Sequence, residues 1–230
     1  MEVFVRRSNV VRRLHALSGV VPLGAFLVEH LWATAAAMKS RDAFDARVLW
    51  LDRWRAGLAF EIVFILAPLA FHALYGVVLA FDKTEKEDAY PYPQNRFRFL
   101  LRASGIASLA FIAWHMWELP IARMLGRVPV HGLFDLASMH LSSTLRGVPW
   151  RAIGYFLGLF VTIFHFAYGL VSFSFSRRPD DAIALRRTTF RVAAFASLLF
   201  LVGGATILSL ATGWPKAHEA PIPAAAKCPP

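Results

Sequence analysis

The sequence predicts an all-α membrane protein in which five transmembrane helices form one bundle. Of its 230 residues, 57% are hydrophobic, above the roughly 45–50% apolar share of ordinary soluble domains. Apolar runs of about 20 residues with few charges are long enough to cross the hydrocarbon core of a bilayer as helices. The chain contains five such runs, at roughly residues 14–37, 56–81, 99–121, 151–175 and 191–212.

Each run is expected to be a helix, because lipid offers the backbone no hydrogen-bond partners and only a helix satisfies its own. No stretch between the runs is large enough to form a soluble domain with its own core. We therefore predict one transmembrane domain over residues 1–213. Residues 214–230 are rich in proline and alanine, and we expect them to be a disordered tail.

Charge and cysteine content exclude several classes of protein. The formal net charge of +10 does not indicate nucleic-acid binding, because the arginines cluster at the ends of the apolar runs, where they anchor at lipid headgroups. Cys228 is the only cysteine. One cysteine cannot build an iron–sulfur site, and there is no C-x-x-C-H motif for covalent haem attachment. Other residues must hold any cofactor non-covalently.

The distribution of Lys and Arg favours a cytoplasmic N-terminus. The N-terminal segment with loops 82–102 and 176–191 carries about 14 such residues. Loops 38–55 and 122–151 with the tail carry about 11. An odd number of spans places the two termini on opposite sides.

Four of the eight histidines lie deep within apolar runs, one in each of the first four: His30, His72, His115 and His165. Ionisable side chains within a bilayer are costly and usually face the interior of a bundle. An interhelical hydrogen bond explains a single such residue, but one in each of four helices favours a shared function. The loop histidines His131, His140 and His218 are expected to have ordinary roles.

Depth along the helices sorts these four histidines into two pairs. Measured from the cytoplasmic end, His72 and His165 fall about 12–15 Å deep, whereas His30 and His115 fall about 24 Å deep. Local sequence sorts them in the same way. The shallow pair carries F-H-x-x-Y-G, in FHALYG and FHFAYG, and the deep pair carries H-x-W, in EHLWA and WHMWE.

Two histidines that face each other at one level can hold a haem iron from both sides, because a neutral imidazole is a good axial ligand. With both axial positions filled, such a haem only transfers electrons. The two levels therefore predict two b haems stacked inside the bundle as an electron path. A zinc site fits less well, because each level offers two ligands and zinc takes about four.

Gly76 and Gly169 each follow a shallow histidine by four residues and so lie on the same helix face. A glycine there leaves room for a flat macrocycle against the backbone. The alternative is ordinary packing of small residues between membrane helices.

Five segments together resemble the dihaem cytochrome b (b558-type) membrane anchor subunits of succinate dehydrogenase, the succinate:menaquinone reductase type found in Bacillus, with relatives in dihaem quinol:fumarate reductases. The segments are RRLHALSGVVP (12–22), LVEHL (27–31), EIVFILAPLAFHALYGVVLAF (61–81), AWHMWE (113–118) and TIFHFAYGLVSF (162–173). They follow the order and spacing of that family across roughly residues 10–175.

The resemblance implies that His72 and His165 bind a proximal haem near the cytoplasmic face, and that His30 and His115 bind a distal haem. It implies a multi-pass protein of the bacterial cytoplasmic membrane that does not itself oxidise succinate. The partners it implies are a flavoprotein subunit and an iron–sulfur subunit, and the electron acceptor is menaquinone. Operation as a menaquinol:fumarate reductase remains open.

Quinone reduction takes two protons as well as two electrons, so an acid/base group is needed near the outer haem. Asp52 lies where the family also carries an acid. Glu61 precedes His72 by eleven residues, nearly a whole number of helical turns, and is expected on the inward face. Asp52 and Glu61 are therefore the candidates for proton transfer to the quinone. Glu29 and Glu118 also lie at the outer ends of helices, but structural roles are the alternative for them: Glu29 pairs with an outer arginine, and Glu118 orients His115 or caps its helix.

Residues at the cytoplasmic start of the first helix are candidates for contact with haem propionates. Arg12, Arg13 and Ser18 qualify on grounds of charge and polarity. His15 binds a propionate, helps to position a second quinone, or only marks the subunit interface.

Two other classes of protein remain as alternatives. One is the dihaem cytochrome b of another oxidoreductase, such as a formate dehydrogenase or hydrogenase. Those families place their histidines on another set of helices, so the pattern of one histidine in each of the first four spans argues against this alternative. The other is a haem-free transporter or receptor that uses the histidines for protons or for packing. Haem content separates the second alternative from the others.

Overall fold

The computed structural model describes residues 2–54, 58–81, 92–119, 121, 125, 132–175 and 182–213. All the named elements in this part of the chain are helices. The predicted tail, Cys228, His131 and His218 lie outside the described residues.

Five helices in the described part of the chain are long and apolar enough to cross a membrane, as predicted. They cover Val10–Met38, Ile62–Phe81, Phe99–Glu118, Trp150–Ser174 and Ala182–Thr212. The last helix begins at Ala182 rather than near residue 191. Its first residues include Arg186, Arg187 and Arg191, which lower the local hydropathy without ending the helix.

The first span is not a uniform α-helix. Helix α1 (Glu2–Ser18) continues through a π-helical turn (Gly19–Leu23) into α2 (Gly24–Thr34) and a 3-10 turn (Ala35–Met38). Pro22 lies within the π turn. Because proline lacks an N–H and crowds the carbonyl four residues earlier, the α-helical hydrogen bonds are interrupted there, and the wider π turn accommodates the interruption.

The second span repeats this feature. Helix α4 (Leu58–Glu61) leads through a π-helical turn (Ile62–Leu66) into α5 (Ala67–Phe81). Pro68 is the second residue after the turn. Wide turns of this kind often mark functional sites. In both spans the turn lies within about six residues of a histidine, His15 in the first span and His72 in the second.

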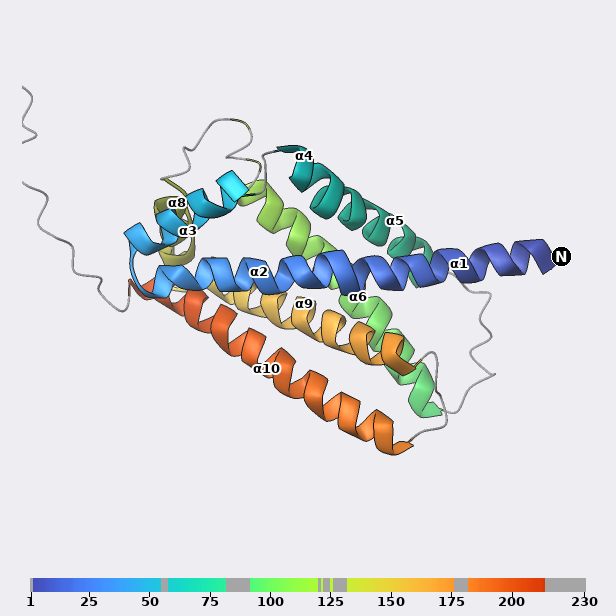
Figure 1. Cartoon of the computed structure of the whole chain (residues 1–230). Helices are drawn as coiled ribbons and strands as arrows, with labels where there is room; N and C mark the ends of the chain where they lie inside the picture. Colours follow the sequence, from blue (N-terminus) through green and yellow to red (C-terminus); the bar gives the residue numbers. More distant parts are fainter. Residues whose placement is uncertain are drawn as a thin grey trace, which may run out of the picture.

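The remaining spans are α6 (Tyr92–Glu118), α9 (Trp150–Phe175) and α10 (Ala182–Thr212). Helix α9 packs against both α6 and α10, and α1 packs against α5, as Figure 1 shows. Glycines permit close approach of α9 and α10. A Cβ atom added at Gly203 would lie 2.8 Å from Leu159, and one added at Gly204 would lie 3.1 Å from Phe156.

Two helices that the sequence analysis did not predict lie between the spans. Helix α3 (Arg41–Trp54) and helix α8 (Leu133–Ser142) fall within predicted loops. They lie together at the end of the molecule away from the N-terminus (Figure 1), where Arg41 of α3 forms an ion pair with Asp135 of α8. Both are too short to span a membrane, so a search for long apolar runs misses them.

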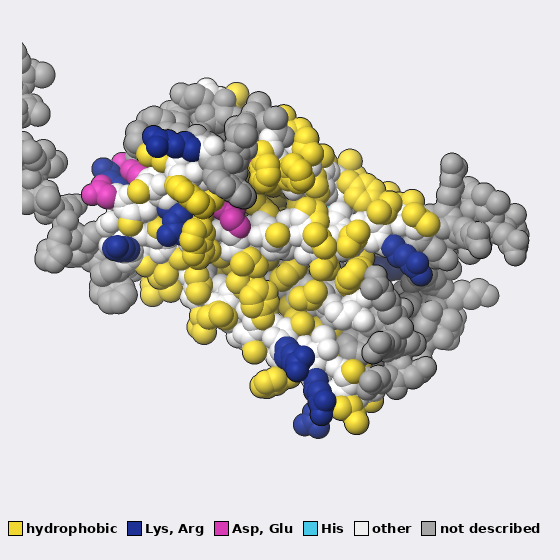
Figure 2. Space-filling view, in the orientation of Figure 1, with side chains coloured by type: hydrophobic (Ala, Val, Ile, Leu, Met, Phe, Trp, Pro, Cys, Tyr) yellow, Lys and Arg dark blue, Asp and Glu magenta, His cyan; other side chains and the backbone are white. Residues whose placement is uncertain are grey.

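The surface supports a membrane location. Leu74, Phe81 and Phe190 are 71%, 74% and 75% exposed, and large exposed apolar areas on a soluble monomer are rare. Figure 2 shows hydrophobic side chains over the middle of one face, with charged side chains gathered toward its ends. This is the distribution that a bilayer core between two aqueous layers requires.

Candidate functional site

The two shallow histidines face each other across α5 and α9. The ring centroids of His72 and His165 are 6.2 Å apart, and their planes are inclined by 77°. Two imidazoles that bind one metal through bonds of about 2.0 Å have centroids about 6 Å apart. The separation therefore fits two axial ligands of one iron.

The two deep histidines also meet, across α2 and α6. The ring centroids of His30 and His115 are 5.7 Å apart, with planes inclined by 76°. The structure thus brings together the same two pairs that depth and local sequence indicate. Each pair supplies two ring nitrogens from two different helices, as bis-histidine ligation of haem requires.

Hydrogen bonds assign the protonated nitrogen of His72. Its Nδ1 lies 3.0 Å from the backbone carbonyl oxygen of His15 and 3.3 Å from Oγ of Ser18. A carbonyl oxygen only accepts, so Nδ1 carries the hydrogen. In the neutral ring Nε2 then keeps its lone pair and is the nitrogen available to a metal.

His165 has the same arrangement on the opposite side. Its Nδ1 lies 3.2 Å from Oγ of Ser104, which itself donates to the carbonyl oxygen of Leu101 at 3.0 Å. Because the hydroxyl hydrogen is used in that bond, the serine oxygen accepts from Nδ1 of His165. Both shallow histidines therefore present a bare Nε2, the state in which imidazole binds iron.

A cavity of about 320 Å³ opens between the shallow histidines. Its lining includes Arg12 and His15 from α1, His72 and Gly76 from α5, Arg102 and Gly105 from α6, and His165 from α9. Two guanidinium groups at its wall suit a ligand that carries carboxylates, because Arg binds carboxylates with paired hydrogen bonds.

The four residues predicted to contact haem propionates differ in their distance from the cavity and from the shallow histidines. His15 stacks on His72, with ring centroids 4.2 Å apart and planes within 6°. Its Nε2 is buried and has no hydrogen-bond partner among the described residues. Arg12 lines the cavity, whereas Arg13 is exposed outside it. Ser18 contacts His72.

The two predicted haem-packing glycines also differ. Gly76 lines the cavity, and a Cβ atom there would lie 3.1 Å from Nε2 of His15. A Cβ atom built on Gly169 has no atom of another described element within 4 Å. Their roles in haem packing remain predictions.

The acidic candidates at the deep end are only partly described. The side chain of Asp52 lies outside the described residues, although its backbone belongs to α3. Glu61 ends α4 and is partly buried, and Glu29 is partly buried beside His30. The π turn after Glu61 uses an extra residue, so Glu61 is rotated away from the face that an unbroken α-helix would give it.

Glu118 forms a network that the sequence analysis did not predict. Its side chain is 8% exposed, accepts a hydrogen bond from the Tyr155 hydroxyl at 3.1 Å, and lies 3.2 Å from Nε of Arg151. The ring centroid of Tyr155 lies 5.8 Å from that of His115. Glu118 therefore connects α6 to the start of α9 and supports a side chain packed on a deep histidine.

We expect Glu118→Ala to destabilise the protein by about 1–3 kcal/mol, because the buried Tyr155 hydroxyl loses its acceptor. Tyr155→Phe should destabilise the protein less, because it removes the hydroxyl donor itself and leaves the Glu118–Arg151 ion pair in place. The melting temperature of the purified protein in detergent measures both effects. Ser142→Ala, at an exposed hydroxyl, serves as the control, and equal melting temperatures for all variants would contradict the expectation.

His140 of α8 approaches the same network, with Nδ1 3.9 Å from Oε2 of Glu118. Burial and the positive charge of Arg151 lower the pKa of His140, and the negative charge of Glu118 opposes them. The folded state therefore takes up a proton at His140 less readily than the unfolded state does, so this residue makes folding less favourable as the pH falls below about 6.5. We expect His140→Asn to lose less melting temperature than the wild type between pH 7.5 and pH 5.5. An equal or larger loss would contradict this.

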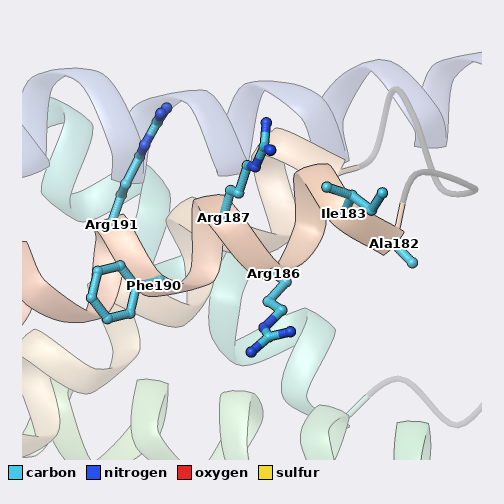
Figure 3. Close-up of a pocket in the computed structure, with 6 residues that line it drawn as sticks. All are labelled: Ala182, Ile183, Arg186, Arg187, Phe190 and Arg191. Carbon is cyan, nitrogen blue, oxygen red and sulfur yellow. The ribbon is translucent and has the colours of Figure 1, made fainter.

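A second hollow, of about 710 Å³, lies at the start of α10 and contains Arg186, Arg187 and Arg191 (Figure 3). Arg187 and Arg191 project to one side of the helix, and Phe190 lies beside them. It is open, and the described residues that line it include no histidine and no acidic residue. Despite its larger volume, we therefore place the functional site at the histidine pairs.

Comparison with known proteins identifies the family. The chain is 35% identical over 196 residues to the succinate dehydrogenase cytochrome b558 subunit of Bacillus subtilis (strain 168), covering 85% of this chain and 91% of the relative. The chain belongs to the succinate dehydrogenase cytochrome b558 subunit family. This confirms the family predicted from the five segments. No family model and no solved structure matches the chain.

Membership of the cytochrome b558 family indicates which cofactor and which kind of complex are relevant to the histidine pairs. A cytochrome b carries haem b, and succinate dehydrogenase is an enzyme complex, so the family provides the class of cofactor and the kind of assembly. The five apolar helices agree with a multi-pass membrane subunit.

Proposed function

We propose that this chain is the membrane anchor and electron-transfer subunit of a succinate dehydrogenase, carrying electrons from an iron–sulfur subunit to menaquinone. The observation that carries the proposal is the presence of two facing imidazole pairs built from the first four spans, with centroid separations of 6.2 and 5.7 Å. The similarity to the succinate dehydrogenase cytochrome b558 subunit of Bacillus subtilis supports the same role.

In this proposal His72 and His165 hold the proximal haem b, and His30 and His115 hold the distal one. A haem with two histidine ligands supplies one-electron transfer and leaves no axial position for substrate. The shallow pair supplies imidazoles with an available Nε2 and a cavity between them, and both pairs lie in apolar surroundings. A haem-free role in packing does not account for two bare Nε2 atoms beside one cavity.

Arg12 and Arg102 are proposed to bind the carboxylates of the proximal haem, because both line the cavity beside the shallow pair. Arg12 was a candidate from its sequence position, and Arg102 is added by the structure. Arg13 is exposed and is a weaker candidate for this role. The polar wall would orient the haem edge, while the imidazoles hold its iron.

The acceptor side of the proposal needs a group that supplies protons to the reduced quinone. Asp52 and Glu61 are proposed for this step. We place them near the outer face on the basis of a cytoplasmic N-terminus in the bacterial cytoplasmic membrane. The flavoprotein and iron–sulfur subunits then dock on the opposite, cytoplasmic face.

Purification of the tagged chain from its native membrane tests the proposal. We expect a flavoprotein and an iron–sulfur protein to copurify, and the complex to reduce a menaquinone analogue with succinate. Asp52→Asn and Glu61→Gln should slow quinone reduction while leaving reduction of a water-soluble dye unchanged. Isolation of the chain without either soluble subunit would contradict the proposed function.

A further inference from the structure

A Ser-Gly pair occurs once in the first span and once in the third. Ser18-Gly19 follows His15-Ala16-Leu17, and Ser104-Gly105 follows Leu101-Arg102-Ala103. The two pairs are 86 residues apart (104 − 18), and the deep histidines of the same spans are 85 apart (115 − 30). The two spans therefore carry a Ser-Gly pair and a histidine in matching positions.

Each glycine of these pairs contacts the ring of a shallow histidine. A Cβ atom built on Gly19 would lie 2.5 Å from Cε1 of His72, and one built on Gly105 would lie 3.0 Å from Cε1 of His165. In both cases the next nearest atoms are Nδ1 and then Nε2 of the same ring. The imidazole thus lies against the glycine backbone in the same orientation in both halves.

Each serine contacts the Nδ1 atom of that same ring. Ser18 Oγ donates to the carbonyl oxygen of His15 at 2.8 Å, and Ser104 Oγ donates to that of Leu101 at 3.0 Å. The serine oxygens then lie 3.3 Å from Nδ1 of His72 and 3.2 Å from Nδ1 of His165. The carbonyl, hydroxyl and glycine backbone form one surface that fits the edge and face of an imidazole.

We propose that Ser18-Gly19 and Ser104-Gly105 are positioning residues for His72 and His165. The first span would set the ring plane and the Nδ1–H tautomer of the histidine in the second span, and the third span would do the same for the fourth. The proximal site is then built from two copies of one two-helix unit. This inference rests on the proposed function, because it concerns how the chain prepares ligands for the proximal haem.

The arrangement has a consequence for the redox potential. A hydrogen bond from Nδ1–H to an acceptor makes the opposite nitrogen a stronger donor to a metal. A stronger donor stabilises the oxidised iron and lowers the potential. Removal of the Ser104 oxygen should therefore raise the potential of the proximal haem and leave that of the distal haem unchanged. Removal of the Ser18 oxygen should raise it less, because the carbonyl oxygen of His15 still accepts from Nδ1 of His72.

The experiment on the glycines uses the intact membrane complex with Gly19→Ala and Gly105→Ala. We expect Gly19→Ala to lose most of the proximal haem, because its Cβ atom would overlap the His72 ring. Gly105→Ala should lose less haem or shift its low-temperature EPR signal, since the overlap is smaller. Gly204→Ala is the matched control, because its Cβ atom would lie 3.1 Å from a ring of Phe156 rather than from a histidine. Two haems with unaltered EPR signals in both variants would overturn the proposal.

The experiment on the serines remains informative if the glycine variants fail to assemble. Ser18→Ala and Ser104→Ala each remove one hydroxyl, and a potentiometric titration of the visible haem bands should show a raised potential for one haem only. Ser104→Thr restores the hydroxyl and should restore the potential. Thr206→Val, at a buried hydroxyl bonded to its own helix, is the control. Unchanged potentials in both alanine variants would overturn the proposal, whereas a wild-type complex without haem would overturn the proposed function instead.

Discussion

Replacement of His72 or His165 by alanine is expected to remove one of two b haems and to leave the other in place. Each of these residues provides one of two imidazole rings whose centroids lie 6.2 Å apart. With one imidazole gone, the iron loses an axial ligand, and the remaining ring holds the cofactor weakly. The haem content of the purified chain, extracted and counted, should fall from two to about one per chain.

His140→Ala is the matched control for the shallow pair, because His140 lies on α8, outside the spans and outside the cavity. It should retain both haems. The double variant His72→Ala, His165→Ala should retain only the haem of the deep pair. If this double variant kept its full haem content, the shallow pair would have a role other than ligation.

His115→Ala is expected to lower succinate:menaquinone reduction by more than about tenfold, because His115 is a proposed ligand of the distal haem, on the acceptor side of the proposed electron path. Reduction of a water-soluble dye by the same complex should change little. The ratio of the two rates separates loss of the quinone step from loss of assembly. His30→Ala should behave in the same way, since His30 is the facing member of the pair.

The spectrum of the His115→Ala complex supplies an independent readout. The haem that remains should have the potential of the wild-type proximal haem. A variant that keeps both haems and the wild-type rate ratio would contradict the ligation of a haem by the deep pair. A variant that loses both haems would show that the pairs assemble together.

Much of the architecture follows from the sequence because the constraint is strong. A segment in lipid must satisfy its own backbone, so a long apolar run predicts a helix more securely than any local propensity does. The pairing of the histidines follows from the fixed rise of 1.5 Å per residue in an α-helix. Depth along straight helices was therefore enough to group the same residues that the structure brings together.

Features that depend on departures from this regularity were missed. The π turns after Ser18 and Glu61 alter the faces of two spans, and an eleven-residue spacing cannot reveal them. Helix α3 carries charges of both signs, and α8 is only 10 residues long, so neither forms an apolar run of the length that predicts a membrane span. The Glu118 network joins residues 37 positions apart, and only the packing of α9 on α6 shows that they meet.

The Ser-Gly pairs show a different limit. Both dipeptides are visible in the sequence, but serine and glycine are common between membrane helices. The dipeptide alone does not indicate which residue of another helix it contacts. Gly76 and Gly169 could be singled out because each follows a histidine on its own helix by four residues. Gly19 and Gly105 contact histidines on other helices, a relation that becomes evident only when helix packing is known.

The ligation of two haems by the four histidines of the spans is tested by a reduced-minus-oxidised visible spectrum of the purified complex, with haem counted per copy of this chain. We expect two b haems per chain, both low-spin with two nitrogen ligands in the oxidised state. A complex that contains no haem would contradict it, because the four histidines of the spans would then serve only packing or proton transfer.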